Sequence, residues 1–235
     1  KNLNLIDKNK VDVIFNALHG KEGEDGIAQS YFEYLKIPYT HSGVISSYNS
    51  MNKIISKEIF FKNKIPTPKY FSLSKNKINN KNLKKFIFIK KLRFPIVIKP
   101  INEGSSLGVK IVKNLKELNK SASILSKKYN QILFEQFIGG QEIQVAVINN
   151  IPLGAIELIP KRSFYDYKAK YTKAANTKHV MPARLNKKKY NEVLKLAKIA
   201  HLSLGCKGVT RSDFKFYKNK FYLLEINTQP GMTNL

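Results

Sequence analysis

Three oxygen-bearing side chains lie close together near the C-terminal end of the sequence. In Leu224-Glu225-Ile226-Asn227, residues 225 and 227 are two positions apart in an expected strand, so both side chains leave the same sheet face. The strand expected before it adds Asp213. Oxygen donors on neighbouring strands suit Mg²⁺, which keeps several waters and takes further ligands from substrate phosphates. Polar positions on the solvent side of a half-buried hairpin are the alternative interpretation.

A lysine and a glycine-serine loop indicate a phosphate site earlier in the chain. Lys99 ends the apolar run 95–98, where an ammonium group is poorly placed unless an anion meets it. The loop 103–108 follows, and its two glycines and two serines let backbone N–H groups approach phosphate oxygens. An ordinary hairpin turn would have the same composition. Lys53 is a second candidate phosphate ligand, although most lysines in this chain must lie on the surface.

Two further residue types that do chemistry are present. His19 and Glu24 lie in a polar loop after an expected strand, where ligand sites are common. A histidine held by a local hydrogen bond is the alternative for His19. The single cysteine, Cys206, is expected to be buried packing, because the sequence offers no base that would activate it as a nucleophile.

The elements expected to position these residues alternate between helices and strands, which predicts an α/β or α+β protein. The expected strands cover residues 11–15, 95–100, 107–112, 132–137, 142–148, 208–217 and 221–227. The expected helices are 27–35, one capped by Ser50, one within 75–91, one at 114–129 capped by Asn114 with Glu117, and one at 190–204. The polar segment 160–183 is long enough to be a lid or binding loop.

The composition is that of a globular protein, and it bears on whether the chain binds nucleic acid. The chain has 235 residues, 43% of them hydrophobic, and a formal net charge of +26. Four of its 42 basic residues are arginines, which leaves 42 − 4 = 38 lysines. Nucleic-acid binders more often use arginine, which makes bidentate contacts. A compositional bias toward Lys, Asn and Ile, which have AT-rich codons, is therefore the preferred explanation of the charge. No apolar run approaches the ~18 residues of a membrane span.

Taken in order, these segments resemble the D-alanine–D-alanine ligases, enzymes of the ATP-grasp type, across nearly the whole chain. The segments that carry the resemblance in the N-terminal half are Ala17-Leu18-His19-Gly20, Gly23-Glu24-Asp25-Gly26, Pro38-Tyr39-Thr40, Ser42-Gly43-Val44, Ser50-Met51-Asn52-Lys53, Ile98-Lys99-Pro100 and Glu103-Gly104-Ser105-Ser106-Leu107-Gly108. Those in the C-terminal half are Phe164-Tyr165-Asp166-Tyr167-Lys168-Ala169-Lys170-Tyr171, Pro182-Ala183, Gly205-Cys206-Lys207-Gly208, Arg211-Ser212-Asp213 and Glu225-Ile226-Asn227-Thr228-Gln229-Pro230-Gly231-Met232-Thr233.

The resemblance implies that family's reaction, which joins two D-alanines for cell-wall precursors. ATP would phosphorylate the carboxylate of the first D-alanine, and the amine of the second would attack the acyl phosphate. The tetrahedral intermediate would collapse to dipeptide, ADP and phosphate. Mg²⁺ or Mn²⁺ would neutralise the transferring phosphate. Tyr171 favours an amine as second substrate, because related ligases that make D-alanyl-D-lactate replace this lid tyrosine.

The resemblance also implies a role for individual residues. The metal would be held by Asp213, Glu225 and Asn227. ATP would be bound by Lys53, Lys99, Ser106, Glu135, Gln136, Ile138, Glu142 and Lys170, with Glu135 and Glu142 at the adenine and ribose ends. The catalytic and substrate-binding roles would fall to Arg211 and the Gly231 backbone at the oxyanion, His19 and Glu24 at the first D-alanine, and Ser105 hydrogen-bonded to Tyr171 between loop and lid.

The implied architecture is an ATP-grasp fold with a truncated, Rossmann-like N-terminal domain. That domain would occupy residues 1–41, a central subdomain 42–135, and a C-terminal subdomain 136–235 with the lid loop 160–183. Full-length protein is expected to be a cytoplasmic homodimer that binds neither nucleic acid nor membrane. The family's Gly-Gly-x-Ser-x-Glu segment and C-terminal serine-leucine lack counterparts here, so we expect a fragment that is impaired or inactive. Lys168 and Asn52 stand where many members have Glu and Asp.

Two other functions remain open on the sequence. One is a different ATP-grasp carboxylate–amine ligase, such as a D-alanine–D-serine enzyme, against which the 165–171 lid motif argues. The other, more remote, is a basic nucleic-acid-binding protein. That reading leaves Asp213, Glu225 and Asn227 unexplained, and the sequence has no RNP-like, zinc-finger or helix-turn-helix signature.

Overall fold

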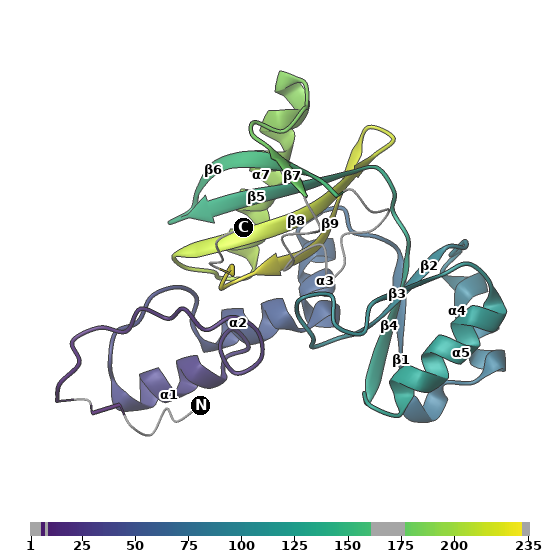
Figure 1. The fold of residues 1–235 in the computed structure, drawn as a ribbon, viewed down its shortest axis with the longest axis horizontal. Coiled ribbons are helices and arrows are strands. Elements are labelled where there is room, and N and C mark those ends of the chain that lie inside the picture. Colours follow the sequence, from purple (N-terminus) through teal and green to yellow (C-terminus); the bar gives the residue numbers. More distant parts are fainter. Residues whose placement is uncertain (1–5, 8, 161–176, 232–235) are drawn as a thin grey trace.

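Two antiparallel sheets dominate the computed structural model, which describes residues 6–7, 9–160 and 177–231 (Figure 1). The first sheet has the order β1-β4-β2-β3 and the second β7-β6-β5-β8-β9. Strands of the first sheet are β1 (Tyr70–Ser74), β2 (Ile96–Pro100), β3 (Lys110–Val112) and β4 (Gln131–Gln136). Strands of the second sheet are β5 (Gln141–Ile148), β6 (Ile151–Ile159), β7 (Lys178–Val180), β8 (Val209–Tyr217) and β9 (Lys220–Asn227).

Helices α4 (Asn80–Ile89) and α5 (Leu115–Ser126) cover one side of the first sheet (Figure 1). They close a core that includes Leu83, Leu118 and Phe134, all fully buried. The predicted cap of α5 is confirmed, because the Glu117 backbone N–H donates to Asn114 Oδ1 at 2.9 Å and Asn114 Nδ2 donates to Glu117 Oε1 at 2.8 Å. The Glu117 N–H is one of the groups that the first turn of a helix leaves without a partner, and the bond between the two side chains holds the capping residue in place.

Helix α7 (Lys187–Ser203) packs on the second sheet, and helix α3 (Lys53–Lys62) joins the same core. Phe60 of α3 is fully buried there, and Ile65, just after the helix, is 2% exposed. Phe60 and Ile65 therefore pack with the C-terminal sheet, although the sequence grouped their segment with the central subdomain. An apolar helix face marks the side that will be buried and does not say which sheet will bury it.

Several local predictions differ from the structure. Ser50 does not cap a helix but lies inside α2 (Val44–Met51). The helical conformation is interrupted at Asn52, which caps α3 instead: its Oδ1 accepts from the Ile54 and Ile55 backbone N–H groups at 3.1 and 3.2 Å. The strand expected at 11–15 is reduced to a single parallel bridge between Ile14 and Tyr39. Strands β1, β6 and β7 were not predicted. Strand β6 contains a proline and a glycine that obscure its alternation, and β7 lies inside the segment 160–183 that was expected to be a lid or binding loop.

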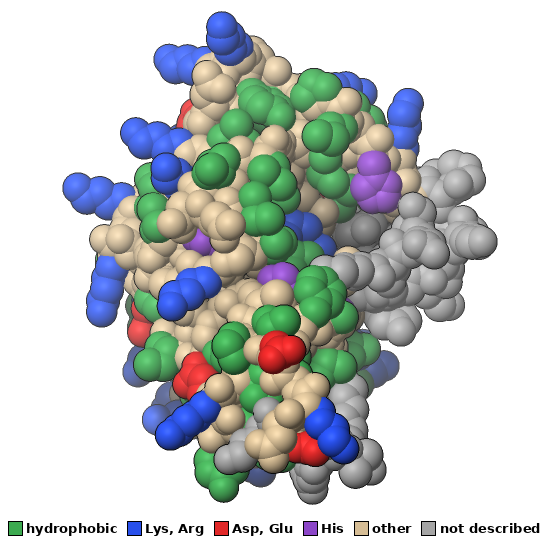
Figure 2. Space-filling view, turned by 90° about the vertical axis from the view of Figure 1, so that its left-hand side faces the viewer, with side chains coloured by type: hydrophobic (Ala, Val, Ile, Leu, Met, Phe, Trp, Pro, Cys, Tyr) green, Lys and Arg blue, Asp and Glu red, His purple; other side chains and the backbone are tan. Residues whose placement is uncertain are grey.

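The N-terminal part contributes helix α1 (Ile27–Leu35), which has the predicted bounds and lies beside α2 (Figure 1). On the face drawn in Figure 2, the lysine and arginine side chains stand apart from one another around the rim, with hydrophobic side chains between them. The described residues visible on that face therefore form no continuous basic patch. No helix in the described part of the chain combines the length and apolar character that crossing a membrane requires.

Candidate active site

A cavity of about 790 Å³, counted with its open mouth, lies between the two sheets. Nine residues predicted from the sequence line it: Lys53, Lys99, Ser106, Glu135, Gln136, Ile138, Glu142, Asp213 and Glu225. They come from α3, both sheets, the glycine-serine loop and the connection between the sheets. Chain segments more than 170 residues apart thus converge on one concave surface, as ligand sites between subdomains commonly do.

Three buried charged groups meet on the first-sheet side of this cavity. Lys99 Nζ donates to Glu135 Oε1 at 2.6 Å, and Lys57 Nζ lies 2.9 Å from Glu135 Oε2. Burial by itself would raise the pKa of Glu135, but Lys57 and Lys99 together hold that pKa below its ordinary value. The carboxylate is therefore ionised, and its charge is shared between two ammonium groups.

Lys53 occupies the first turn of α3 and connects the two halves of the cavity. Its Nζ donates to the Glu103 backbone carbonyl at 2.6 Å and lies 3.4 Å from Glu225 Oε2. Its backbone N–H donates to the Ile101 carbonyl at 3.0 Å, which anchors the helix start to the end of β2. Burial lowers the pKa of Lys53, while the Glu225 charge opposes that shift. The ammonium is thus placed beside the glycine-serine loop, where an anionic ligand would meet it.

The three predicted metal ligands lie together on β8 and β9. Asp213 stands directly opposite Glu225 in the strand register, and Asn227 Nδ2 lies 3.4 Å from Asp213 Oδ2. Arg211 clamps Asp213 with two hydrogen bonds, from Nε to Oδ1 at 2.8 Å and from Nη2 to Oδ2 at 3.0 Å. Within residues 6–7, 9–160 and 177–231, no three His, Cys, Asp or Glu side chains gather as metal ligands. Two carboxylates and an amide nevertheless suit a cation that takes its other ligands from phosphates and water.

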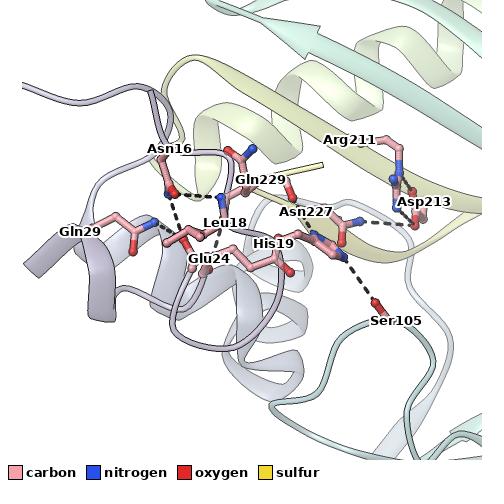
Figure 3. A network of polar contacts seen from close by, with 12 residues as sticks. Asn16, Leu18, His19, Glu24, Gln29, Ser105, Arg211, Asp213, Asn227 and Gln229 are labelled. Atoms are coloured by element: carbon pink, nitrogen blue, oxygen red, sulfur yellow. Dashed lines mark hydrogen bonds and ion pairs between the residues drawn. The ribbon is translucent and has the colours of Figure 1, made fainter. Parts of the chain in front are cut away.

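A second polar network joins the N-terminal loop to the end of β9 (Figure 3). His19 Nδ1 lies 2.8 Å from the Gln229 carbonyl oxygen and 3.2 Å from Glu24 Oε2, and Nε2 lies 3.4 Å from Ser105 Oγ. The hydrogen bond with Glu24 raises the pKa of His19, against the effect of burial. Gly231 is close by, since a Cβ there would lie 3.8 Å from His19 Cδ2. His19 therefore contacts both the Glu24 carboxylate and Ser105 of the glycine-serine loop.

The remaining predicted residues are distributed as follows. The Gln136 amide bonds to the backbone of Arg93, with Arg93 N–H to Oε1 at 2.8 Å and Nε2 to the Arg93 carbonyl at 2.9 Å. Its side chain is thereby fixed, which leaves its backbone to line the cavity. Glu142 Oε2 accepts from Lys215 Nζ at 2.9 Å. Lys170 and Tyr171, with the rest of the 164–171 motif, lie outside the described residues.

Two lysines at the site were missed by the sequence reasoning. Lys215 pairs with Glu142, and Lys57 pairs with Glu135. The available signal for Lys57 was its position four residues after Lys53, which places both on one face of a helix. Among 38 lysines that spacing was too common to single it out.

Comparison with known proteins decides the family. Residues 59–235 match the family model described as "D-ala D-ala ligase C-terminus", and residues 2–42 match "D-ala D-ala ligase N-terminus". The chain belongs to the D-alanine–D-alanine ligase family. Among relatives, the ligase of Pelagibacter ubique is 58% identical over 234 residues, covering 96% of this chain and 73% of the relative. The ligase of Geotalea uraniireducens is 42% identical, covering 96% and 71%.

Solved structures of ligases agree with the fold. A Bacillus anthracis D-alanine–D-alanine ligase complexed with ATP superposes with a TM-score of 0.81 at 34% identity, covering 95% of this chain and 70% of that one. The VanG D-Ala:D-Ser ligase of Enterococcus faecalis superposes with a TM-score of 0.83 at 31% identity, covering 94% and 65%. The predicted ATP-grasp ligase fold, with a partial N-terminal domain, is thus confirmed, and the chain is an ATP-binding carbon–nitrogen ligase by family.

Proposed function

We propose that this chain joins two D-alanines with ATP bound in the cavity between the two sheets. The observation that carries the proposal is the convergence of Lys53, Lys99, Asp213 and Glu225 on that cavity. The 58% identity to the Pelagibacter ubique ligase over 96% of the chain supports D-alanine as the substrate. Phosphoryl transfer is catalysed mainly by positioning and by neutralising charge, and this cavity is lined by both cations and oxygen donors.

In the proposed ATP site, the phosphates meet Lys53 and Lys99, and the backbone of residues 136–138 borders the adenine. The loop 103–108 covers the phosphates through its backbone N–H groups, aided by Ser106. Ser105 and Ser106 already have left-handed backbone angles, with φ of 52° and 60°. Such strained conformations in non-glycine residues gather at ligand clamps. Glu142, held by Lys215, would meet the ribose. Lys170 is a further proposed phosphate ligand outside the described residues.

The oxygen donors on β8 and β9 fit Mg²⁺ or Mn²⁺. Asp213 is a buried carboxylate, 5% exposed, and such a group requires a counter-charge. Arg211 provides that charge in this structure through two hydrogen bonds. A divalent cation held by Asp213, Glu225 and Asn227 would neutralise the transferring phosphate. Arg211 would then be released from Asp213 and, with the Gly231 backbone N–H, stabilise the oxyanion.

The first D-alanine would bind beside His19 and Glu24. The two side chains are 3.2 Å apart, and Glu24 is 4% exposed. The contact between His19 and Ser105 couples this subsite to the loop over the phosphates. Tyr171, in the proposed lid, would close the site from the other side and keep water from the acyl phosphate.

The proposed domain boundaries, assembly state and cellular location are those that the same family implies. We propose an N-terminal part ending near residue 41 and ATP-grasp subdomains that meet near residue 136. We propose that the full-length protein is a homodimer, as the family resemblance implies. We place it in the bacterial cytoplasm, because the reaction consumes ATP. Light scattering during size-exclusion chromatography would measure the assembly state, and a monomer at micromolar concentration would contradict the dimer.

Phosphate release tests the function. The full-length protein is incubated with ATP and Mg²⁺ plus D-alanine, L-alanine, D-alanine with D-serine, or D-alanine with D-lactate, and products are identified by mass spectrometry. We expect D-alanyl-D-alanine with D-alanine alone, lost in Glu225→Gln and retained in Glu58→Gln, which alters an exposed carboxylate of α3. ATP binding is measured in parallel by calorimetry. Product formed solely with D-serine would keep the fold and the ATP site and overturn the substrate.

A further inference from the structure

Lys57 is a fully buried lysine for which neither the family resemblance nor the cavity lining supplies a task. It lies on α3 one turn after Lys53 and has no exposed surface. Its Nζ donates to Thr67 Oγ1 at 2.6 Å, lies 2.9 Å from Glu135 Oε2, and stands 5.3 Å from the centroid of the Tyr70 ring. Glu135 lines the cavity, whereas Lys57 is not among its lining residues.

A structural role alone gives a weak reason for this residue. A buried ion pair is often no more stabilising than apolar side chains of the same volume, because both charges lose their hydration. Burial lowers the pKa of Lys57 to about 8, although the Glu135 charge raises it. The side chain therefore remains protonated at neutral pH, at a cost that packing by a methionine would avoid. Stability alone therefore does not explain a lysine at this position, and we look for a role of its positive charge in the site.

The charge count of the site indicates what that is. Three buried lysines, Lys53, Lys57 and Lys99, face two glutamates, Glu135 and Glu225, so the cluster carries 3 − 2 = +1. Lys57 binds Oε2 of Glu135 and Lys99 binds Oε1. Without Lys57, the count falls to zero and Lys99 becomes the sole close cationic partner of Glu135 among the described residues. An ammonium fully engaged by a buried carboxylate is a poor partner for a phosphate.

We propose that Lys57 is a positioning residue for the ATP site. By binding Glu135 Oε2, it neutralises that carboxylate and so leaves Lys99 available to the nucleotide phosphates. This inference rests on the proposed ATP site. It assigns Lys57 no contact with ATP, and its effect passes through Glu135 to Lys99. The effect must therefore depend on the phosphates of the ligand and on the charge of Glu135, which gives two separate tests.

The first test compares two ligands. Binding of ATP and of adenosine is measured by calorimetry with the wild-type chain, with Lys57→Met, and with Lys62→Met, a control that removes an exposed lysine of the same helix. In Lys57→Met we expect the Kd for ATP to rise about tenfold or more, the scale of one charge-assisted hydrogen bond. The Kd for adenosine should change less than about twofold. Loss of both affinities in the same proportion would show a purely structural role and overturn the inference.

The second test removes the charge through which Lys57 acts. In a Glu135→Gln background, Lys99 has no carboxylate to neutralise, so adding Lys57→Met should change the Kd for ATP by less than about twofold. A tenfold loss in that background as well would refute the proposed route through Glu135. Circular dichroism establishes that each variant is folded, and Lys57→Gln replaces Lys57→Met if the methionine variant does not fold. Wild-type chain that binds neither ligand would overturn the proposed function together with this inference.

Discussion

Two adjacent phenylalanines on α3 give a matched test of how that helix is attached. Phe60 is fully buried in the core of the second sheet, whereas Phe61 is 80% exposed. Replacing a core phenylalanine by alanine removes its burial and leaves a cavity, which costs about 3–5 kcal/mol. An exposed side chain without special contacts changes stability by about 0.5 kcal/mol or less. Phe60→Ala and Phe61→Ala should therefore differ by at least about 2.5 kcal/mol.

Urea unfolding followed by circular dichroism would measure this difference. With a urea dependence of about 2–3 kcal/mol per molar, Phe60→Ala should lower the midpoint by about 1–2.5 M, and Phe61→Ala should leave it nearly unchanged. Because Lys53 and Lys57 lie on the same helix, the Phe60 variant should also bind ATP more weakly. Equal midpoints for the two variants would refute the claim that α3 is held by the second core.

Three further predictions concern single residues. Asn52→Ala removes the side chain that caps α3 and should destabilise the chain by about 1 kcal/mol, measured by the same urea titration. Burial raises the pKa of Cys206 to about 11, so at pH 8 its thiolate fraction is about 200-fold below that of an ordinary cysteine. Thiol-reactive dye should label it slowly in native protein and rapidly in urea, and rapid native labelling would contradict its burial. Glu24 raises the pKa of His19, so their pairing stabilises the fold fully below pH of about 6.5 and is lost as pH rises through the raised value. The stability lost in His19→Gln should accordingly shrink with rising pH, and a loss that grew instead would exclude the pairing.

The sequence by itself determined the elements whose signals are local. The apolar spacing of residues 27–35 predicted α1, and Asn114 with Glu117 predicted the start of α5, because helix period and capping depend on residues within one turn. The two-residue spacing of Glu225 and Asn227 predicted that both leave one sheet face, and strand β9 places them so. The order of short motifs was specific enough to indicate the family.

The tertiary structure alone decided which charges meet. Lys57, Lys99 and Glu135 come from α3, β2 and β4. Nothing in their local sequence predicts that the two lysines will bind the two oxygens of one buried carboxylate. The position of Asp213 on β8 directly opposite Glu225 on β9 likewise follows from strand register. Pairing between distant segments is set by how whole faces pack and exclude water, a property of the folded chain that no window of neighbouring residues contains.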